Sequence, residues 1–96
     1  MTAAADLFKA NKFAEALAAF QQLPADDARV LYYTALATGF STNKWEATGD
    51  AATLAAKAQQ AEKAGTPAKA DIDAAFAGLK ETQGKKWLDF YRGSIK

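Results

Sequence analysis

Paired carboxylates are the side chains of this 96-residue chain whose type and spacing could support acid–base chemistry. The pairs are Asp26 with Asp27 and Asp71 with Asp73. Acid–base catalysis requires both groups to reach one substrate. The first two are adjacent in a predicted turn, and the second two lie two positions apart, where helical side chains point in different directions. We therefore expect these residues to cap helices and to interact with helix dipoles.

Nucleophiles and metal ligands are scarce. The chain has no Cys and no His, so disulfides, thiolate metal sites and a histidine general base are all excluded. Ser41 and Ser94 consequently have no histidine to activate them. We expect a protein that is not an enzyme and that has no cofactor and no metal.

The net charge of +1 gives no reason to expect a nucleic acid or an anionic membrane as partner. Residues 1–50 carry a net charge of −2 and residues 51–96 a net charge of +3, so a weak nucleic-acid binder using the basic C-terminal third is a less favoured alternative. The sequence shows no signal peptide and no apolar stretch long enough for a membrane span. We expect a cytoplasmic protein, or a domain of a longer one.

Apolar periodicity predicts six helices and no strand. Their approximate ranges are 2–10, 12–23, 27–38, 50–64, 67–79 and 83–91. Pro24 ends the second helix, and Asp26 or Asp27 supplies the N-cap of the third. Gly39 is expected to end the third helix, which makes residues 40–49 the main loop.

Alanine accounts for 25 of the 96 residues, which favours closely packed helices because alanine has high helix propensity and lets backbones approach. The helix over 50–64 should bury an alanine-rich side and leave Glu62 at the surface. Asn11 either ends the first helix or caps the second. Gly65 should end the fourth.

The aromatic residues are the better candidates for function. Four phenylalanines lie on apolar helical stripes and are predicted to be core: Phe13, Phe20, Phe76 and Phe90. Tyr32 and Tyr33 lie about 100° apart on a helix, so we expect one to be buried and the other to reach a groove. Trp45 lies in the polar loop, either as a plug over the core or as an exposed anchor for a partner. Trp87 has the same two interpretations, with core favoured.

The segment "KFAEALAAFQQLP" resembles the second helix of a tetratricopeptide repeat. The positions that carry the resemblance are Phe13, Ala16, Phe20 and Pro24. The next segment, "ARVLYYTALATG", is similar to the first helix of the following repeat, with Leu31 and Ala35 at its large and small apolar positions. The best-matching helices lie within residues 2–38 and the resemblance extends to residue 64. Residues 66–93 would then form a closing helix pair.

This resemblance implies one all-α domain over residues 1–96, built as a short superhelix of five to six helices in antiparallel pairs. It also implies a non-enzymatic scaffold that binds a peptide or protein segment on its concave surface of first helices. The partner-binding residues would then be Lys9, Asn11, Arg29 and Tyr33, with Trp45 as a further anchor. The alternative is a structural helical bundle, natural or engineered, that binds no ligand or associates with itself.

Overall fold

The structure is a computed structural model that describes residues 2–23, 27–42, 50–65, 69–76 and 83–93. These ranges contain six α-helices and no strand, which confirms the all-α prediction. The helices are α1 (Thr2–Lys9), α2 (Phe13–Gln21), α3 (Ala28–Thr42), α4 (Asp50–Lys63), α5 (Lys69–Phe76) and α6 (Gln83–Gly93). None of the helices within these ranges has the length and apolar character needed to cross a membrane.

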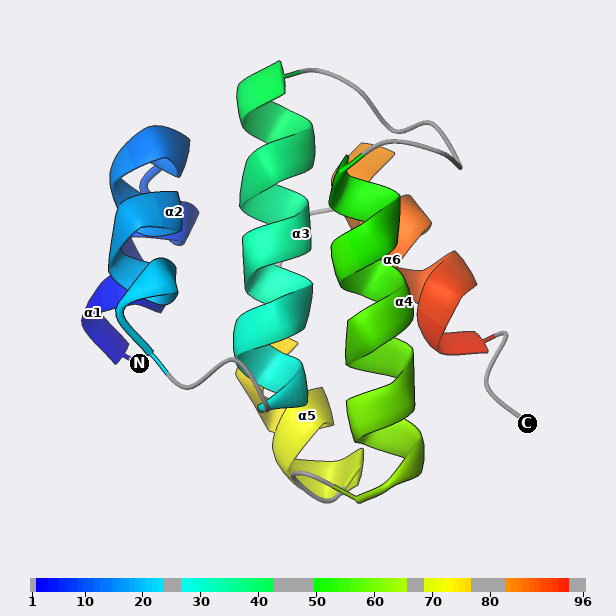
Figure 1. Cartoon of the computed structure of the whole chain (residues 1–96). Coiled ribbons are helices and arrows are strands. Elements are labelled where there is room, and N and C mark those ends of the chain that lie inside the picture. Colours follow the sequence, from blue (N-terminus) through cyan, green and yellow to red (C-terminus); the bar gives the residue numbers. More distant parts are fainter. Residues whose placement is uncertain (1, 24–26, 43–49, 66–68, 77–82, 94–96) are drawn as a thin grey trace.

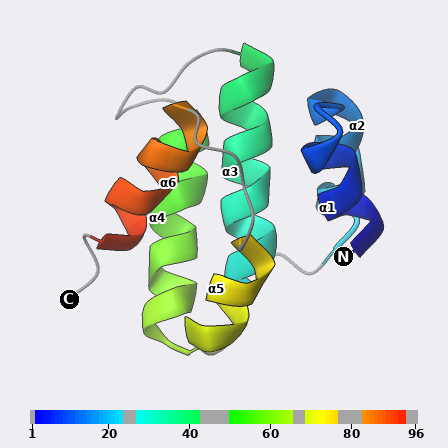
Figure 2. The ribbon, with the colours of Figure 1, turned by 180° about the vertical axis from the view of Figure 1, so that it is seen from behind.

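Helix α3 is the centre of the molecule. It packs most extensively against α4 and α2, and it also contacts α1, α5 and α6. Figure 1 shows α2, α3 and α4 side by side, with α2 and α4 running antiparallel to α3. Seen from behind, α1, α5 and α6 form the opposite side (Figure 2). The predicted antiparallel packing of α2 against α3 is thus confirmed.

Two residues with positive φ mark helix ends. Asn11 has a φ of 65°, its backbone N–H donates to the Phe8 carbonyl at 3.0 Å, and the next N–H, of Lys12, donates to the Leu7 carbonyl at 2.9 Å. This is the Schellman arrangement, so Asn11 ends α1 and does not cap α2. Gly65, with a φ of 80°, follows the end of α4 as predicted.

Asp27 is the N-cap of α3. Its Oδ1 accepts a hydrogen bond from the Arg29 backbone N–H at 2.8 Å, and its carbonyl accepts the first helical bond from Leu31 at 3.0 Å. Of the two aspartates considered from sequence, Asp27 therefore has this role, and Asp26 lies outside the described residues.

The prediction that Gly39 ends the third helix is wrong, because α3 continues to Thr42. The ring of Phe40 stacks on Phe13, with centroids 4.5 Å apart and planes at 10°, and contacts Phe8 edge-on at 5.8 Å. Glycine inside a helix costs about 1 kcal/mol relative to alanine. The aromatic contacts that follow Gly39 offset that cost and keep the last turn helical.

Several predicted boundaries cannot be compared with the structure. The remainder of the loop, residues 43–49 with Trp45, lies outside the described residues, as do residues 66–68 and 77–82 around α5. The described part of α5 and the whole of α6 fall within or close to their predicted ranges.

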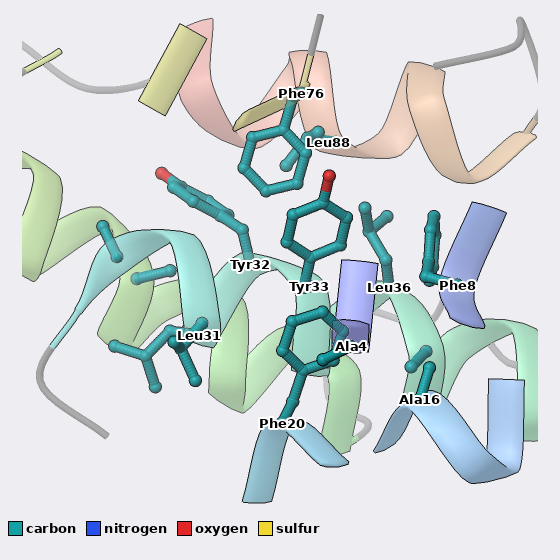
Figure 3. Packing of buried hydrophobic residues seen from close by; sticks show 14 of the residues in the cluster. Ala4, Phe8, Ala16, Phe20, Leu31, Tyr32, Tyr33, Leu36, Phe76 and Leu88 are labelled. Atoms are coloured by element: carbon teal, nitrogen blue, oxygen red, sulfur yellow. The ribbon is translucent and has the colours of Figure 1, made fainter. Parts of the chain in front are cut away.

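Six rings form what we call the aromatic core: Phe8, Phe13, Phe20, Tyr33, Phe40 and Phe76. Tyr33 lies between two of them, stacked on Phe20 at a centroid distance of 5.0 Å and on Phe76 at 4.3 Å (Figure 3). Phe8 meets Tyr33 edge-on at 5.3 Å. The aromatic core joins α1, α2, α3 and α5 around a single side chain.

Both tyrosines of α3 are buried, with 0% of the surface of Tyr32 and of Tyr33 exposed. The expectation that only one of them is buried is therefore wrong. Each finds a partner for its hydroxyl inside the protein, Glu62 for Tyr32 and the Ala75 carbonyl for Tyr33. Because both hydroxyls are satisfied, both rings can be buried.

Helix α4 packs on α3 through small residues. Its buried side chains, here called the alanine seam, are Ala51, Ala52, Ala55 and Ala58. Their small size lets the two backbones approach closely. The predicted use of alanine is thus confirmed for this helix.

The prediction that Glu62 is a surface residue is wrong, since its side chain is only 7% exposed. It accepts hydrogen bonds from Arg92 at 2.9 and 3.1 Å and from the Tyr32 hydroxyl at 2.8 Å. Arg92 also pairs with Asp73 at 2.7 Å. We call these four residues the Glu62 network; it joins α3, α4, α5 and α6.

The Glu62 network alters the pKa values of two of its members. Burial, followed by the hydrogen bond to Glu62, raises the pKa of the Tyr32 phenol well above its usual value of 10.0. The hydrogen bonds to Glu62 likewise raise the pKa of the Arg92 guanidinium. Tyr32 therefore stays neutral and Arg92 charged over the whole range in which the protein would be handled.

Phe90 was predicted to be core, and it is 69% exposed. Leu88, two positions earlier on α6, is buried. Positions two apart on a helix point about 200° from each other, so a buried Leu88 turns Phe90 to the solvent. Trp87 and Tyr91 flank Leu88 and are both partly buried, with their rings 4.7 Å apart.

Candidate functional site

The candidate functional site is a hollow of about 350 Å³ on the side of the molecule where α1, α3 and α5 meet. This side faces the viewer in Figure 2. Its lining residues are Ala5, Asp6, Lys9, Arg29, Tyr33, Asp71, Ala74 and Ala75. We call it the α1–α3–α5 groove.

Three of the five residues proposed from sequence lie together in this groove: Lys9, Arg29 and Tyr33. Asn11 does not. It lines a separate hollow near the start of α2, and its backbone conformation serves to end α1. Trp45 lies outside the described residues. The groove thus contains part of the candidate set, supplied by two helices that are not adjacent in sequence.

Helix α1 contributes one charge of each sign to the groove. Asp6 and Lys9 are three positions apart, which places them on neighbouring points of the helix surface, and both are exposed. Lys9 lies in the last turn of α1, where a positive charge interacts favourably with the helix dipole. Both side chains are accessible to a ligand in the groove.

Arg29 is held by its own helix cap. Its guanidinium donates to both carboxylate oxygens of Asp27, at 2.6 and 3.1 Å. These bonds lower the pKa of Asp27 and raise the pKa of Arg29, and Asp71 on α5 adds to the attraction on Arg29. The side chain is still 34% exposed. It is therefore fixed in direction and can still meet a ligand.

Tyr33 lies at the floor of the groove. Its ring belongs to the aromatic core, and its hydroxyl donates to the carbonyl of Ala75. Burial raises the pKa of the Tyr33 phenol to about 12. The hydroxyl already donates to the Ala75 carbonyl, and none of the side chain's surface is exposed. Tyr33 therefore shapes the groove and does not offer a hydrogen bond to a ligand.

The sequence reasoning missed Asp6 and Asp71 as groove residues. Asp71 lies in the first turn of α5, so its sequence context indicated only a favourable interaction with the helix dipole. Its presence beside Arg29 depends on how α5 crosses α3, which local periodicity does not specify. With Lys9 and Arg29, the two aspartates give a groove whose charged lining sums to zero.

A second hollow is lined by residues of α2 and the segment just after it, of α3 and of α4. Its volume is about 440 Å³. Most of its lining is apolar; the residues are Leu17, Phe20, Gln21, Leu23, Val30, Leu31, Thr34, Thr38, Asp50 and Leu54. We call it the α2–α4 groove. It lacks the mixed charges of the α1–α3–α5 groove.

The basic residues of α6 are partly engaged within the protein. Lys85 pairs with Asp89 at 2.7 Å, and Arg92 belongs to the Glu62 network. Lys86 is exposed. Within the described ranges, no group of three or more potential metal-ligating side chains is arranged to hold a metal ion.

Comparison with protein-family models, curated proteins and solved structures finds no significant match. The tetratricopeptide-like resemblance therefore stays a prediction from the sequence.

Proposed function

We propose that this protein is a non-enzymatic scaffold that binds a peptide or protein segment in the α1–α3–α5 groove. The observation that carries the proposal is that Lys9, Arg29 and Tyr33, chosen from the sequence as partner-binding residues, line one hollow. Arg29 and Tyr33 share one face of α3 because they are four positions apart, whereas Lys9 is brought to them from α1 by the fold.

The lining suits an extended peptide. Ala5, Ala74 and Ala75 are small and let a bound backbone approach the helices. Side chains of both signs stand at the edges, so a segment with one acidic and one basic residue can pair with Lys9 and with Asp71. The volume of about 350 Å³ is near the lower end of the range for ligand sites, roughly 300–1,000 Å³. A few residues of a peptide fill such a site.

The order of the helices also supports the proposal. If the chain is divided into pairs α1–α2, α3–α4 and α5–α6, the groove is lined by the first helix of every pair. This is the surface that a tetratricopeptide-like superhelix would use for its partner. A cytoplasmic location is part of the same proposal.

The test is selection from a displayed library of random peptides, followed by affinity measurements on the variants Lys9→Glu and Asp71→Lys. Both residues are exposed, so these variants should fold as the parent does. We expect selected peptides to carry charges of both signs. Each variant should weaken binding by about tenfold or more, which is typical of a residue central to an interface.

Lys57→Glu is the matched control, because Lys57 is exposed on α4, away from the groove. It changes the net charge by the same amount as Lys9→Glu and should leave the affinity unchanged. The proposal fails if no peptide is enriched, or if the selected peptides respond equally to the control and to the groove variants.

A further inference from the structure

We propose that the α2–α4 groove binds Phe90 of a second copy of this chain, so that the protein associates with itself head to tail. The surfaces involved are separate from the α1–α3–α5 groove. This inference therefore stands independently of peptide binding.

Phe90 is a large apolar side chain directed away from its own core. Among the described residues it is the one large hydrophobic side chain that is mostly exposed, at 69%. Aromatic side chains bury a large apolar area when they find a pocket and are enriched at the centres of interfaces. Phe90 thus has the chemistry of an interface anchor.

The α2–α4 groove has the chemistry of the matching pocket. Leu17 and Leu23 line it from α2 and the segment just after α2, Val30 and Leu31 from α3, and Leu54 from α4. Leu17, Leu23 and Leu54 are only partly buried, so apolar surface remains for a ligand to cover. A phenyl ring entering the groove would exchange water for aliphatic contacts on several sides.

Charge favours the same pairing. Lys86 is exposed one helical turn before Phe90, and Asp50 lies in the lining of the groove. In the whole sequence, residues 1–50, which supply most of the groove, have a net charge of −2, whereas residues 51–96, which include α6, have a net charge of +3. Lys86 of one copy can therefore pair with Asp50 in the groove of another.

The arrangement of the helices decides the type of assembly. The groove is lined by α2, α3 and α4, which lie side by side in Figure 1, whereas α6 is a different helix that lies in front of α4 in Figure 2. A heterologous contact joins two different surfaces, so it gives an open chain with one uncovered groove and one uncovered Phe90 at its ends, or a ring where the rotation between copies closes. Growth beyond a dimer is therefore expected as the concentration rises.

Analytical ultracentrifugation over a range of concentrations up to the order of 1 mM tests this proposal, because a contact centred on one side chain is weak. The parent should show an average mass that rises with concentration past that of a dimer. Phe90→Ala should weaken association by about tenfold or more, and Lys86→Glu should weaken it less. Lys63→Glu, at an exposed position of α4, is the control of equal charge change.

A mixing experiment isolates the head-to-tail geometry. Phe90→Ala keeps an intact groove, and Leu54→Lys keeps an intact Phe90 but places a charge in the groove. Neither variant should associate alone, and an equimolar mixture should form a dimer that does not grow further. Leu17→Lys replaces Leu54→Lys if circular dichroism shows that the latter is unfolded.

Three outcomes overturn the proposal. They are a parent that stays monomeric at every concentration, a Phe90→Ala variant that associates as the parent does, and a mixture of the two variants that remains monomeric or grows beyond dimers. The last of these would place the contact on other surfaces.

Discussion

Tyr32 and Tyr33 are neighbours on α3, yet they belong to two regions that are held together in different ways. Tyr33 is at the centre of the aromatic core, where stacked rings from α1, α2, α3 and α5 meet. Tyr32 donates to Glu62 in a network of ion pairs and hydrogen bonds with α4, α5 and α6. The two side chains are adjacent in sequence but point in different directions from α3, so one reaches an apolar region and the other a polar one.

The two regions tolerate change differently. Apolar contact is non-directional, and a ring that loses one neighbour keeps its others. In the Glu62 network, the removal of either Glu62 or Arg92 leaves a mostly buried charge without its main partner. In the aromatic core, the loss of stability should therefore grow with the amount of side chain removed. In the Glu62 network, the effect of a substitution should depend on whether its charged partner is still present.

The largest effect is expected from Tyr33→Ala, which removes the ring between Phe20 and Phe76. The loss of a large buried side chain costs about 3–5 kcal/mol of the free energy of unfolding. Urea denaturation followed by circular dichroism measures it. Tyr33→Phe is the matched control: it keeps the ring, loses only the bond to Ala75, and should cost about 1 kcal/mol. Equal losses in the two variants would show that the stack contributes little.

Arg92→Ala should be next, at about 3 kcal/mol, because it leaves the Glu62 carboxylate buried without its cation. The side chains involved are 16% and 7% exposed. The double variant Arg92→Met with Glu62→Leu removes both charges and should recover part of the lost stability, while it leaves the buried Tyr32 hydroxyl without its acceptor. A double variant no more stable than Arg92→Ala would contradict this account of the network.

Alkaline pH should act on the aromatic core through Tyr33. Its pKa is about 12 in the folded protein and about 10 when unfolded, so its contribution is complete below pH 10 and is lost as the pH rises towards 12. Two pKa units correspond to about 2.7 kcal/mol. Measured from pH 9 to 12, the denaturation midpoint of the parent should therefore start above that of Tyr33→Phe, meet it and then fall below it, because the alkaline loss is larger than the advantage of about 1 kcal/mol that the hydroxyl gives at lower pH. If the midpoints of the two proteins fall in parallel as the pH rises, ionisation of Tyr33 does not cause the loss of stability at alkaline pH.

Asp27→Ala should have the smallest effect, a loss of about 1 kcal/mol of the free energy of unfolding, because it removes only the N-cap of α3. The pKa of Asp27 is lowered by Arg29, so the stabilisation is present above about pH 4 and is lost as the pH falls through the lowered value. Below that range the parent and the variant should have the same denaturation midpoint. If the two midpoints still differ in acid, the stabilisation comes from packing of the Asp27 side chain and not from its charge.

The helices themselves could be predicted because their signals are local. Apolar stripes, Asn11, Gly65 and the cap at Asp27 each act within a few residues of the chain. The aromatic core was foreseen in part for the same reason, since Phe13 and Phe20 stand on one stripe of α2.

Two of the errors, at Gly39 and at Glu62, occur where a residue distant in sequence decides the outcome. Gly39 stays helical because Phe40 meets Phe13 from another helix, and Glu62 is buried because Arg92 reaches it from thirty positions away. Phe90 is exposed because Leu88 takes the inward position on α6. In the candidate site, Lys9 and Arg29 were identified by their type, whereas Asp71 required the position of α5.

The central position of α3 also bears on the order of events during folding. Its contacts with α2 and α4 join neighbouring parts of the chain, whereas the bond from Tyr33 to Ala75 spans 42 positions and that from Glu62 to Arg92 spans 30. Closing a longer loop costs more chain entropy, so contacts between neighbouring helices should form early. We expect α2, α3 and α4 to form the folding nucleus and α6 to dock last. Amide hydrogen exchange of α6 should accordingly be faster than that of α3.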